Sequence, residues 1–336
     1  MNMKRIAFLA LGFMVFGVSV YAQTAAKVYI SGSYLDGVTE KACYWVDGKR
    51  VDLPEGVRAI GIAVENGKVY AAGYYLASDS NYRYGQACYW IDGEKYDMKY
   101  KNIRNPRNYR FEVTGFAATD GKVYVSGYEQ DNMSSSSRSN YYYYLWIDGE
   151  RTSLSDGSES LIKGITIIDG TACFLYSSSY TFYGQSQSLK GVTTGITAAG
   201  GKIYVSGTTG ISTSNGYLYT ACYWVDGTRV DLPQPSKIQD ATDTTGIVVA
   251  NGTVYVSGQY RQRENDRDST VACYWANSTK IDLPNGASTS GIAVANGNVY
   301  VIGYYKQGNI EIACYWENGV RKPLPGGKTV TGIVVR

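Results

Sequence analysis

One motif recurs along nearly the whole 336-residue chain, and this repetition constrains the fold more than any other feature. The fullest copy runs from Gly-Ile through Val-Tyr-Val and Ala-Cys-Tyr-Trp to Asp-Leu-Pro. The Gly-Ile marker recurs on average about every 45 residues. It occurs at Gly61, Gly115 (followed by Phe116), Gly164, Gly195, Gly246, Gly291 and Gly332. Such a chain stacks one small structural unit many times around a shared core.

Each unit divides into four short β-strands. Strand one contains the Gly-Ile marker, strand two carries Val-Tyr-Val, strand three is Ala-Cys-Tyr-Trp and strand four is Arg-Val-Asp-Leu. Asn66-Gly67 joins strands one and two in one copy, and Asp47-Gly48 joins strands three and four in another. Asn-Gly and Asp-Gly accept the positive φ angles that type I′ hairpin turns require. The sequence therefore predicts an all-β protein made of four-stranded antiparallel sheets.

Four-stranded units of about 45 residues are typical of β-propeller blades. The first unit begins at Lys27 with strand two, and the last segment, 328–336, contains only strand one. We expect the C-terminal strand to complete the N-terminal blade and close the ring, which removes open sheet edges. Seven copies of strand two predict seven blades. The fourth unit lacks both Trp and Asp-Leu-Pro, so it is expected to be a stunted three-stranded blade, or to merge with a neighbour in a six-bladed ring.

The N-terminus has the features of a secretory signal peptide. Lys4 and Arg5 precede an apolar stretch over residues 6–20, and Val20-Tyr21-Ala22 offers a cleavage site after Ala22. We therefore expect residues 1–22 to be removed and residues 23–336 to form the propeller domain. The mature protein would be secreted or periplasmic, with no transmembrane segment. An uncleaved anchor is the alternative, although the stretch is short for a bilayer span.

Composition excludes several kinds of chemistry. The chain has no His, which removes every mechanism that needs an imidazole. Removing residues 1–22 would lower the formal net charge from +3 to +1, which gives no electrostatic case for nucleic acid. No motif indicates a cofactor, a metal or a catalytic residue. Of the six cysteines, five occupy the same motif position, so we expect buried free thiols: Cys43, Cys88, Cys222, Cys273 and Cys314.

Two stretches resemble known bacterial repeats. The segment 42–48 (Ala-Cys-Tyr-Trp-Val-Asp-Gly), with Asp-Leu-Pro at 52–54, is similar to extracellular HAF-type repeats. The segment 291–303 resembles the bacterial seven-bladed propeller repeat. The resemblance implies a secreted bacterial β-propeller but no particular activity, because these families are functionally mixed. The chain departs from the HAF pattern by having Cys-Tyr where that pattern has Phe-Leu, and by lacking its His.

Blade topology separates the loops into two faces. The loops between strands one and two, and between strands three and four, are short hairpins on one face, the hairpin face. All long loops fall on the other, the variable-loop face, which is the expected binding face because functional residues concentrate on loops held by a rigid scaffold. The chain is rich in tyrosine, with 33 residues, and tyrosines in two repeated slots are expected to pack between blades. The candidate binding residues beside the variable loops are Tyr74, Tyr75, Tyr82, Tyr84, Arg107, Tyr109, Tyr217, Tyr219, Tyr260, Arg261, Tyr304 and Tyr305.

A second candidate set surrounds the ring axis. The residue before the Gly marker is Thr114, Thr194, Thr245 or Thr331 in four copies, and Lys163 in the fourth unit. Strand one is innermost in a blade, so these side chains would form a polar ring. They either make local hydrogen bonds that pack the blades, or hold water or a small polar or anionic ligand at the channel mouth.

These features favour a monomeric, non-catalytic binding module. We expect it to recognise a glycan, or an envelope or extracellular protein, through the variable-loop face. The alternative is a carboxylate-based glycosidase or lyase at the channel mouth, which needs two acids converging near the axis. A purely structural scaffold is the third possibility.

Overall fold

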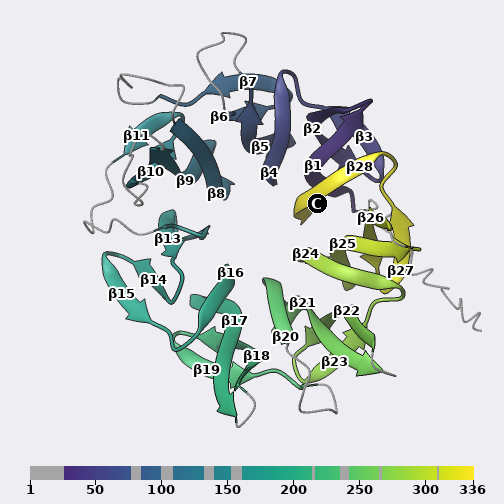
Figure 1. Cartoon of the computed structure of the whole chain (residues 1–336). Helices are drawn as coiled ribbons and strands as arrows, with labels where there is room; N and C mark the ends of the chain where they lie inside the picture. The colour runs from purple at the N-terminus through teal and green to yellow at the C-terminus, as the bar shows by residue number, and fades with distance from the viewer. Residues whose placement is uncertain are drawn as a thin grey trace, which may run out of the picture.

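The computed structural model describes residues 26–76, 85–99, 109–131, 140–152, 161–213, 216–234, 242–264, 267–308 and 310–336. The strands of these segments form seven four-stranded antiparallel sheets around a central axis, which confirms the predicted seven-bladed β-propeller (Figure 1). The first strand of each regular blade lies nearest the axis, as in β4, β8, β16, β20 and β24 (Figure 1).

The strand bounds follow the repeat closely. Blade 1 contains β28 (Gly327–Val335), β1 (Val28–Asp36), β2 (Thr39–Val46) and β3 (Lys49–Asp52). Blade 2 contains β4 (Gly56–Glu65), β5 (Lys68–Tyr75), β6 (Gln86–Ile91) and β7 (Glu94–Asp97), and blade 3 contains β8 (Tyr109–Thr119), β9 (Lys122–Asp131), β10 (Asn140–Ile147) and β11 (Glu150–Thr152). Blade 4 contains β12 (Gly164–Ile168), β13 (Thr171–Leu175), β14 (Ser179–Phe182) and β15 (Gln185–Ser188).

The last three blades are built in the same way. Blade 5 contains β16 (Val192–Ala199), β17 (Lys202–Thr213), β18 (Gly216–Val225) and β19 (Thr228–Asp231). Blade 6 contains β20 (Thr242–Ala250), β21 (Thr253–Glu264), β22 (Arg267–Ala276) and β23 (Thr279–Asp282). Blade 7 contains β24 (Gly286–Ala295), β25 (Asn298–Gln307), β26 (Ile310–Glu317) and β27 (Val320–Pro323).

The ring closes as the half-units at the two ends predict. Strand β28 pairs with β1 in antiparallel register, with Ile333 opposite Ile30. Just beyond the ladder, the Lys27 amide donates to the Arg336 carbonyl at 2.7 Å, and the Arg336 amide donates back at 3.0 Å. The first blade is therefore assembled from the two ends of the domain.

The fourth blade corrects one expectation. It has four strands, β12 to β15, in the same order as the other blades, so neither the three-stranded blade nor the six-bladed ring is right. Its β14 and β15 strands come from Ser-Tyr-Thr-Phe and Gln-Ser-Gln-Ser, which resemble no other copy of the motif. Between them, Tyr183 and Gly184 both have positive φ, so an unrecognised hairpin turn supplies the missing pair of strands.

The predicted hairpin turns are confirmed, and their Asp and Asn side chains have a second role. Asp47 and Gly48 have φ angles of 51° and 79°. The Asp47 carboxylate also accepts a hydrogen bond of 2.9 Å from the amide of Val28, at the start of strand two. Asp92, Asp148, Asp226, Asn277 and Asn318 do the same in their own blades. In every blade except the fourth, the turn between strands three and four therefore fixes the start of strand two.

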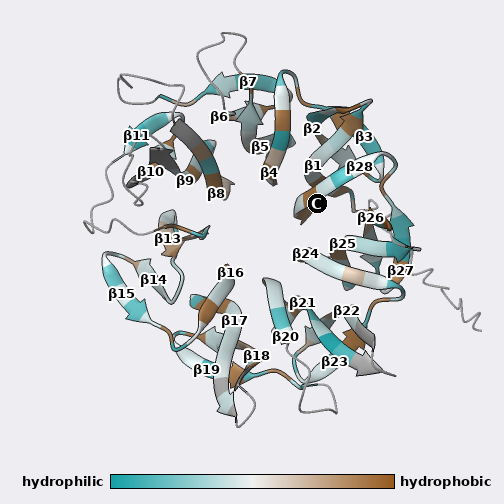
Figure 2. Ribbon diagram, in the orientation of Figure 1, coloured by the Kyte–Doolittle hydropathy of each residue, from teal (hydrophilic) through white to brown (hydrophobic). Residues whose placement is uncertain are grey.

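The hydrophobic core lies between blades. All six Trp side chains are fully buried, and tyrosines of both repeated slots contribute to the clusters between adjacent blades, as predicted. All six cysteines are buried free thiols, which confirms that prediction too. The outermost strands are mostly hydrophilic, as β7, β15 and β27 illustrate (Figure 2).

Candidate binding face

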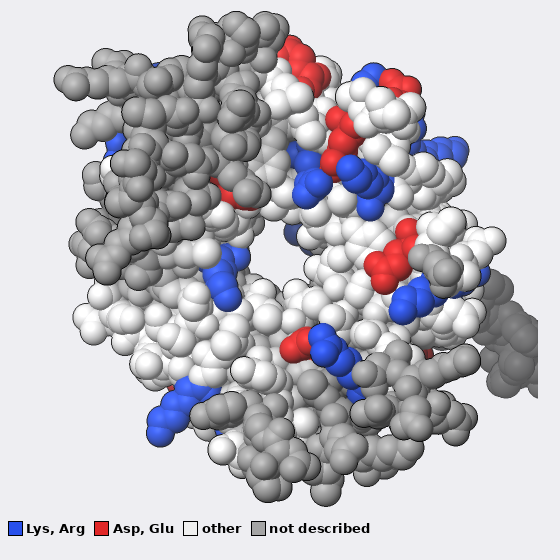
Figure 3. All heavy atoms as spheres, in the orientation of Figure 1, with Lys and Arg blue, Asp and Glu red and all other residues white. Residues whose placement is uncertain are grey.

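The variable-loop face has a compact charged cluster beside the central opening, over β4 and β28 (Figure 3). It joins three strands that are far apart in sequence: Glu40 on β2, Arg58 on β4 and Lys328 on β28. Lys328 is the extra residue of a β-bulge, because the register of β28 against β1 shifts between Thr329 and Gly327. Bulges re-aim side chains away from the regular pleat, which brings the Lys328 ammonium toward β2.

Glu40 is the centre of this cluster. Its carboxylate accepts hydrogen bonds from Arg58 Nε at 2.8 Å and Nη2 at 3.2 Å, and from Lys328 Nζ at 2.7 Å. Ser33 Oγ adds a further bond of 2.7 Å. Burial opposes ionisation of Glu40, but these donors outweigh it and lower the pKa of the carboxyl group to about 2. Glu40 is therefore a fixed anion that joins blades 1 and 2.

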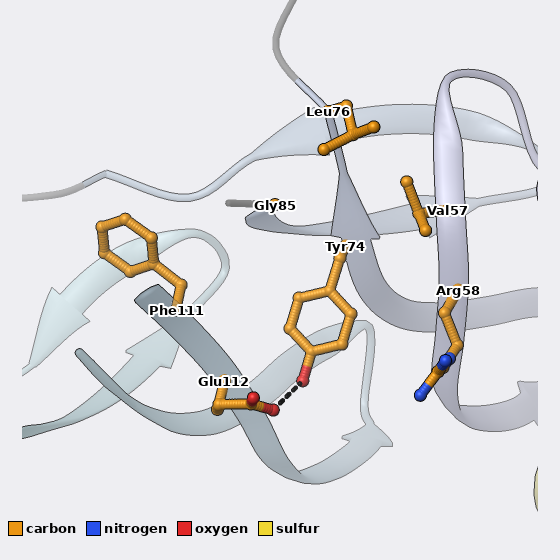
Figure 4. A pocket seen from close by; sticks show the side chains of 7 residues that line it. All are labelled: Val57, Arg58, Tyr74, Leu76, Gly85, Phe111 and Glu112. Carbon is orange, nitrogen blue, oxygen red and sulfur yellow. Dashed lines mark hydrogen bonds between the residues drawn. The ribbon is translucent and has the colours of Figure 1, made fainter. Parts of the chain in front are cut away.

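A cavity of about 300 Å³ opens between blades 2 and 3, next to this cluster (Figure 4). We call it the Arg58 cavity, and it is lined by Val57, Arg58, Tyr74, Leu76, Gly85, Phe111 and Glu112. Val57 and Leu76 supply accessible apolar surface, whereas Phe111 is only 3% exposed. The Arg58 guanidinium, the Tyr74 phenol and the Glu112 carboxylate supply polar groups. Its volume falls at the lower end of the range for small-molecule sites.

Irregular backbone explains why β4 lines this cavity. The register of β4 against β5 shifts at Val57 and again at Ile60, so both are extra residues of bulges. The first bulge brings Val57 to the cavity wall. The carbonyl of Arg58 then approaches β5 so closely that a Cβ atom on Gly73 would lie 2.0 Å from it, and only glycine fits there.

Tyr74 stands between Arg58 and Glu112 in the cavity (Figure 4). Its hydroxyl accepts a hydrogen bond of 2.7 Å from the amide of Val113 and donates to the Glu112 carboxylate at 3.1 Å. Burial and the negative charge of Glu112 raise the pKa of the Tyr74 phenol. The phenol therefore stays protonated at neutral pH and positions Glu112, which makes it unsuited to act as a nucleophile.

Three of the sequence-predicted tyrosines lie in a repeated packing slot. Tyr75, Tyr260 and Tyr305 are each less than 10% exposed, as is Tyr34 at the equivalent position of blade 1. A strand-four cation covers each ring, with Lys95 Nζ lying 3.6 Å from the Tyr75 ring centre. Burial is the main cause that raises the pKa of Tyr75 to about 12. These tyrosine rings are therefore part of the buried core.

The remaining aromatic and charged candidates are scattered. Tyr304 is half-buried, and its hydroxyl accepts a hydrogen bond of 3.1 Å from the amide of Val330. Tyr219 and Arg261 are exposed on β18 and β21, away from the Arg58 cavity. The described part of the chain does not include Tyr82, Tyr84 and Arg107, or the side chains of Tyr109 and Tyr217.

The threonine ring exists, and its hydroxyls connect neighbouring blades. Thr194 bonds to Thr244 at 2.6 Å, Thr245 bonds to Thr289 at 2.7 Å, and Thr331 donates to the Ala59 carbonyl at 2.8 Å. Thr114 likewise donates to the carbonyl of Ile162. In the fourth blade Lys163 takes this role, with Nζ 3.4 Å from the Thr193 carbonyl. These contacts match the packing interpretation of the ring.

A β-bulge explains the position of these hydroxyls. The register of the inner strand shifts around Thr114, Thr194 and Thr245, so each is the unpaired residue of a bulge. Thr331 holds the same position in β28. The backbone irregularity turns each side chain toward the next blade. The Gly that follows the bulge lets neighbouring inner strands approach closely. For example, a Cβ atom added to Gly195 would lie only 3.2 Å from the Cα of Gly246.

The carboxyl groups with a resolved pKa shift do not include a general acid. At Asp36, Glu40 and Glu65 the pKa is lowered, and a general acid needs a raised pKa. Within the described segments, no group of three or more Cys, Asp or Glu residues is arranged to hold a metal ion. In those segments there is also no helix of the length and hydrophobicity needed to cross a membrane.

Comparisons with known proteins do not identify a family. No family model matches the sequence, and no curated protein matches it. The solved structures that resemble it include a Trypanosoma rangeli sialidase with 2,3-difluorosialic acid, at 9% identity and a TM-score of 0.40, covering 82% of this chain and 56% of that one. A Pyrococcus horikoshii acylaminoacyl peptidase matches at 12% identity and a TM-score of 0.41, over 86% of this chain and 48% of that chain.

A phage phi92 endosialidase has 12% identity and a TM-score of 0.40, over 83% of this chain and 60% of that chain. The chain thus spans between 48% and 60% of the length of these three structures. Likeness at this level concerns the fold and says nothing about activity. The resemblance to HAF-type repeats stays a prediction.

Sequence reasoning missed most of the residues that line the Arg58 cavity. Of that lining, only Tyr74 was among the candidates. Arg58 and Glu112 occupy the same position of successive inner strands, two residues before the bulge residue beside the ring axis. The other regular blades have Val192, Asp243, Ser288 or Thr329 at this position. The available signal was this departure from the repeat: two opposite charges in adjacent copies of an otherwise mixed position.

Proposed function

We propose that this protein is an exported, non-catalytic β-propeller that binds carbohydrate in the Arg58 cavity of its variable-loop face. The observation that carries the proposal is the composition of the cavity wall. Val57 and Leu76 offer apolar surface to the C–H faces of a sugar ring, and Arg58, Tyr74 and Glu112 offer donors and acceptors to its hydroxyl groups.

The size of the cavity supports a small ligand. A cavity of about 300 Å³ encloses a group the size of a sugar ring, whereas a stable protein interface buries roughly 800 Å² on each partner.

Arg58 brings five N–H donors, of which Glu40 takes two in the described part of the chain. A guanidinium held in place in this way is preorganised to donate to a ligand, which reduces the entropy lost on binding.

Catalysis is less well supported than binding. Glu40 is held ionised by three donors, and Tyr74 is held protonated by burial and by Glu112. Glu40 therefore does not have the pKa of a general acid at neutral pH, and the protonated Tyr74 phenol is not an activated nucleophile. We therefore expect bound oligosaccharides to be recovered intact.

An extracellular protein is the second candidate partner, favoured by exposed apolar side chains at the tips of two adjacent blades. Leu35 is 48% exposed, Val38 is 99% exposed and Ile310 is 67% exposed. They lie at the ends of the β1–β2 and β25–β26 hairpins, on the same variable-loop face. Exposed apolar residues mark interaction sites only when they form a larger patch, so this candidate stands second.

A glycan array probed with the mature chain, followed by calorimetric titration of each hit, tests the proposal. We expect Leu76→Asp to weaken binding about tenfold or more, because it places a charge at the apolar rim of the cavity. Leu35→Asp is the matched control, since Leu35 has similar exposure on the same face but does not line the cavity. Equal losses in the two variants, or no sugar binding by the wild-type chain, would contradict the proposal. Sugars cleaved during the titration would favour the glycosidase alternative.

A further inference from the structure

A second cavity, of about 350 Å³, lies between blades 1 and 2 on the same face. We call it the Tyr34 cavity, and its wall includes Tyr34, Thr39, Glu40, Lys41, Asp52 and Glu55. Val57 and Leu76 line this cavity as well as the Arg58 cavity. The two cavities are therefore neighbours that share one apolar wall.

From this shared wall we infer that the two cavities form one extended site, with two subsites that bind consecutive units of a neutral oligosaccharide. The inference rests on the proposed function and adds the length and charge of the ligand. Leu76 is 58% exposed, so it forms a low apolar ridge over which a chain can pass from one cavity to the other. Polar groups at both ends and an apolar centre suit a chain of sugar rings, whose hydroxyls lie around their edges.

Most charges of the site are paired within the protein. Asp52 bonds to Arg50 at 2.8 Å, Glu55 bonds to Lys95 at 2.9 Å and Lys41 bonds to Asp36 at 2.5 Å. Glu40 pairs with both Arg58 and Lys328, and the Glu112 carboxylate accepts a hydrogen bond from Tyr74. A charged ligand would have to compete with these pairs, whereas a hydroxyl group can donate to a paired carboxylate or accept from a paired cation. The ligand class is therefore a neutral glycan rather than an acidic one.

The Tyr34 cavity has a rigid wall, as a subsite requires. The Tyr34 hydroxyl donates to Asp52 at 3.2 Å, and the Arg50 guanidinium lies 3.6 Å from the centre of its ring. Leu53 and Ala42 close the bottom of the cavity with buried side chains. Thr39, by contrast, is exposed at the rim and belongs to the end of the β1–β2 ladder, so its replacement is compatible with folding.

Titration of the mature chain with neutral gluco-, manno-, xylo- and galacto-oligosaccharides of increasing length tests this inference. In the series that binds, we expect affinity to rise at least tenfold from one unit to the length that fills both cavities, and then to level off. Thr39→Trp fills the Tyr34 cavity and should abolish this gain while leaving the affinity for the single unit unchanged. Binding should also change less than twofold when salt is raised, because no charged ligand group is involved.

Ile310→Trp is the matched control. Ile310 occupies the equivalent position of the blade 7 hairpin, opposite Gln307 as Thr39 is opposite Asp36, and it lines neither cavity. A gain with length that survives Thr39→Trp, or that Ile310→Trp removes equally, would overturn the two-subsite inference. Affinity that does not depend on length would also overturn it, yet leave the proposed function intact. Absence of binding to every oligosaccharide would overturn the proposed function itself.

Discussion

Blades 1 and 4 share one topology but differ in how they are held. In blade 1, β1 and β2 pair over eight residues, and Trp45 is fully buried. In blade 4, β13 and β14 pair over only two residues, and Thr181 stands where regular blades have Trp. We infer that the order of the four strands depends on turn chemistry and on packing between blades, because blade 4 has this order without a Trp. In the regular blades the Trp motif then adds stability.

The two blades also differ in what they present to solvent. Blade 1 and its neighbour bring Glu40, Arg58 and Lys328 together on the variable-loop face, and both cavities border blade 2. At the boundary between blades 4 and 5, the Lys163 ammonium donates to the Thr193 carbonyl, and the Thr193 hydroxyl donates to the Tyr176 carbonyl. The candidate function is therefore concentrated on one side of a nearly symmetric ring.

The largest expected effect comes from removing a Trp. Trp275 is fully buried on β22, and its Nε1 donates to the Pro233 carbonyl at 2.9 Å across the boundary to blade 5. Trp275→Ala should lower the free energy of unfolding by about 3–5 kcal/mol, the range for deleting a large buried side chain. Urea titration followed by far-UV circular dichroism measures the loss.

Thr181→Ala is the control in blade 4, because Thr181 pairs with Phe174 as Trp275 pairs with Val256. Its loss should be about 1 kcal/mol. Equal losses at the two positions would mean that the Trp motif contributes no extra stability, and the comparison between regular blades and blade 4 would fail.

An intermediate effect is expected from acid at the boundary between blades 1 and 2. The pKa of Glu40 is about 2 in the folded protein, below its ordinary value of 4.5, so its contribution is complete above pH 4.5 and disappears as the pH falls toward 2. Glu40→Gln should lose about 1 kcal/mol near neutral pH, a small value because solvent partly screens the pair.

The difference between wild type and Glu40→Gln should then shrink as the pH falls, which thermal unfolding over this pH range measures. The boundary between blades 4 and 5 offers the comparison, because the Lys163 contact there is to the backbone carbonyl of Thr193 and not to a carboxylate. A Lys163→Met variant should therefore differ from wild type by the same amount at each pH. A constant difference for Glu40→Gln would show that its carboxylate does not act through its charge.

The smallest effects are expected in the ring around the axis. Thr245 bonds to Thr289 at 2.7 Å and Ser257 at 2.9 Å, so Thr245→Val should cost about 0.5–1 kcal/mol. Lys163 makes one longer contact of 3.4 Å, and Lys163→Met should change stability by less than about 0.5 kcal/mol. Calorimetric melting temperatures would compare the two. The reverse order would indicate that Lys163 makes the stronger connection.

Repetition explains why the fold was predictable to the level of single turns. Positive φ at Asp47, Asn66 and their copies follows from Asx-Gly alone, and ring closure follows from the half-units at the two ends. Blade 4 was less predictable because its β14–β15 turn, Tyr183-Gly184, lacks the usual Asx-Gly pair. Tyrosine rarely adopts the positive φ angle that Tyr183 has in this turn, so its presence did not predict a hairpin.

The candidate site was less predictable because it depends on contacts between blades. Arg58 and Glu40 lie on different blades, and Lys328 reaches Glu40 only because the C-terminal strand closes blade 1. Loop-adjacent tyrosines suggested a binding surface, but Tyr75, Tyr260 and Tyr305 turned out to share a slot with Tyr34. The sequence does contain a signal that this tyrosine slot is packed. A Lys or Arg stands two residues before the strand-four Asp, and this cation covers the tyrosine ring, as Arg50 beside Asp52 covers Tyr34.

Amide hydrogen exchange of the protein, with and without a saturating neutral oligosaccharide identified by titration, tests the proposed binding site most directly. The account predicts slower exchange in the segments that line the two cavities, residues 53–58 and 74–76, and no change in the hairpin-face turns such as Asn66-Gly67 and Asn251-Gly252. Protection confined to the hairpin face, or to blades 4 and 5, would contradict it.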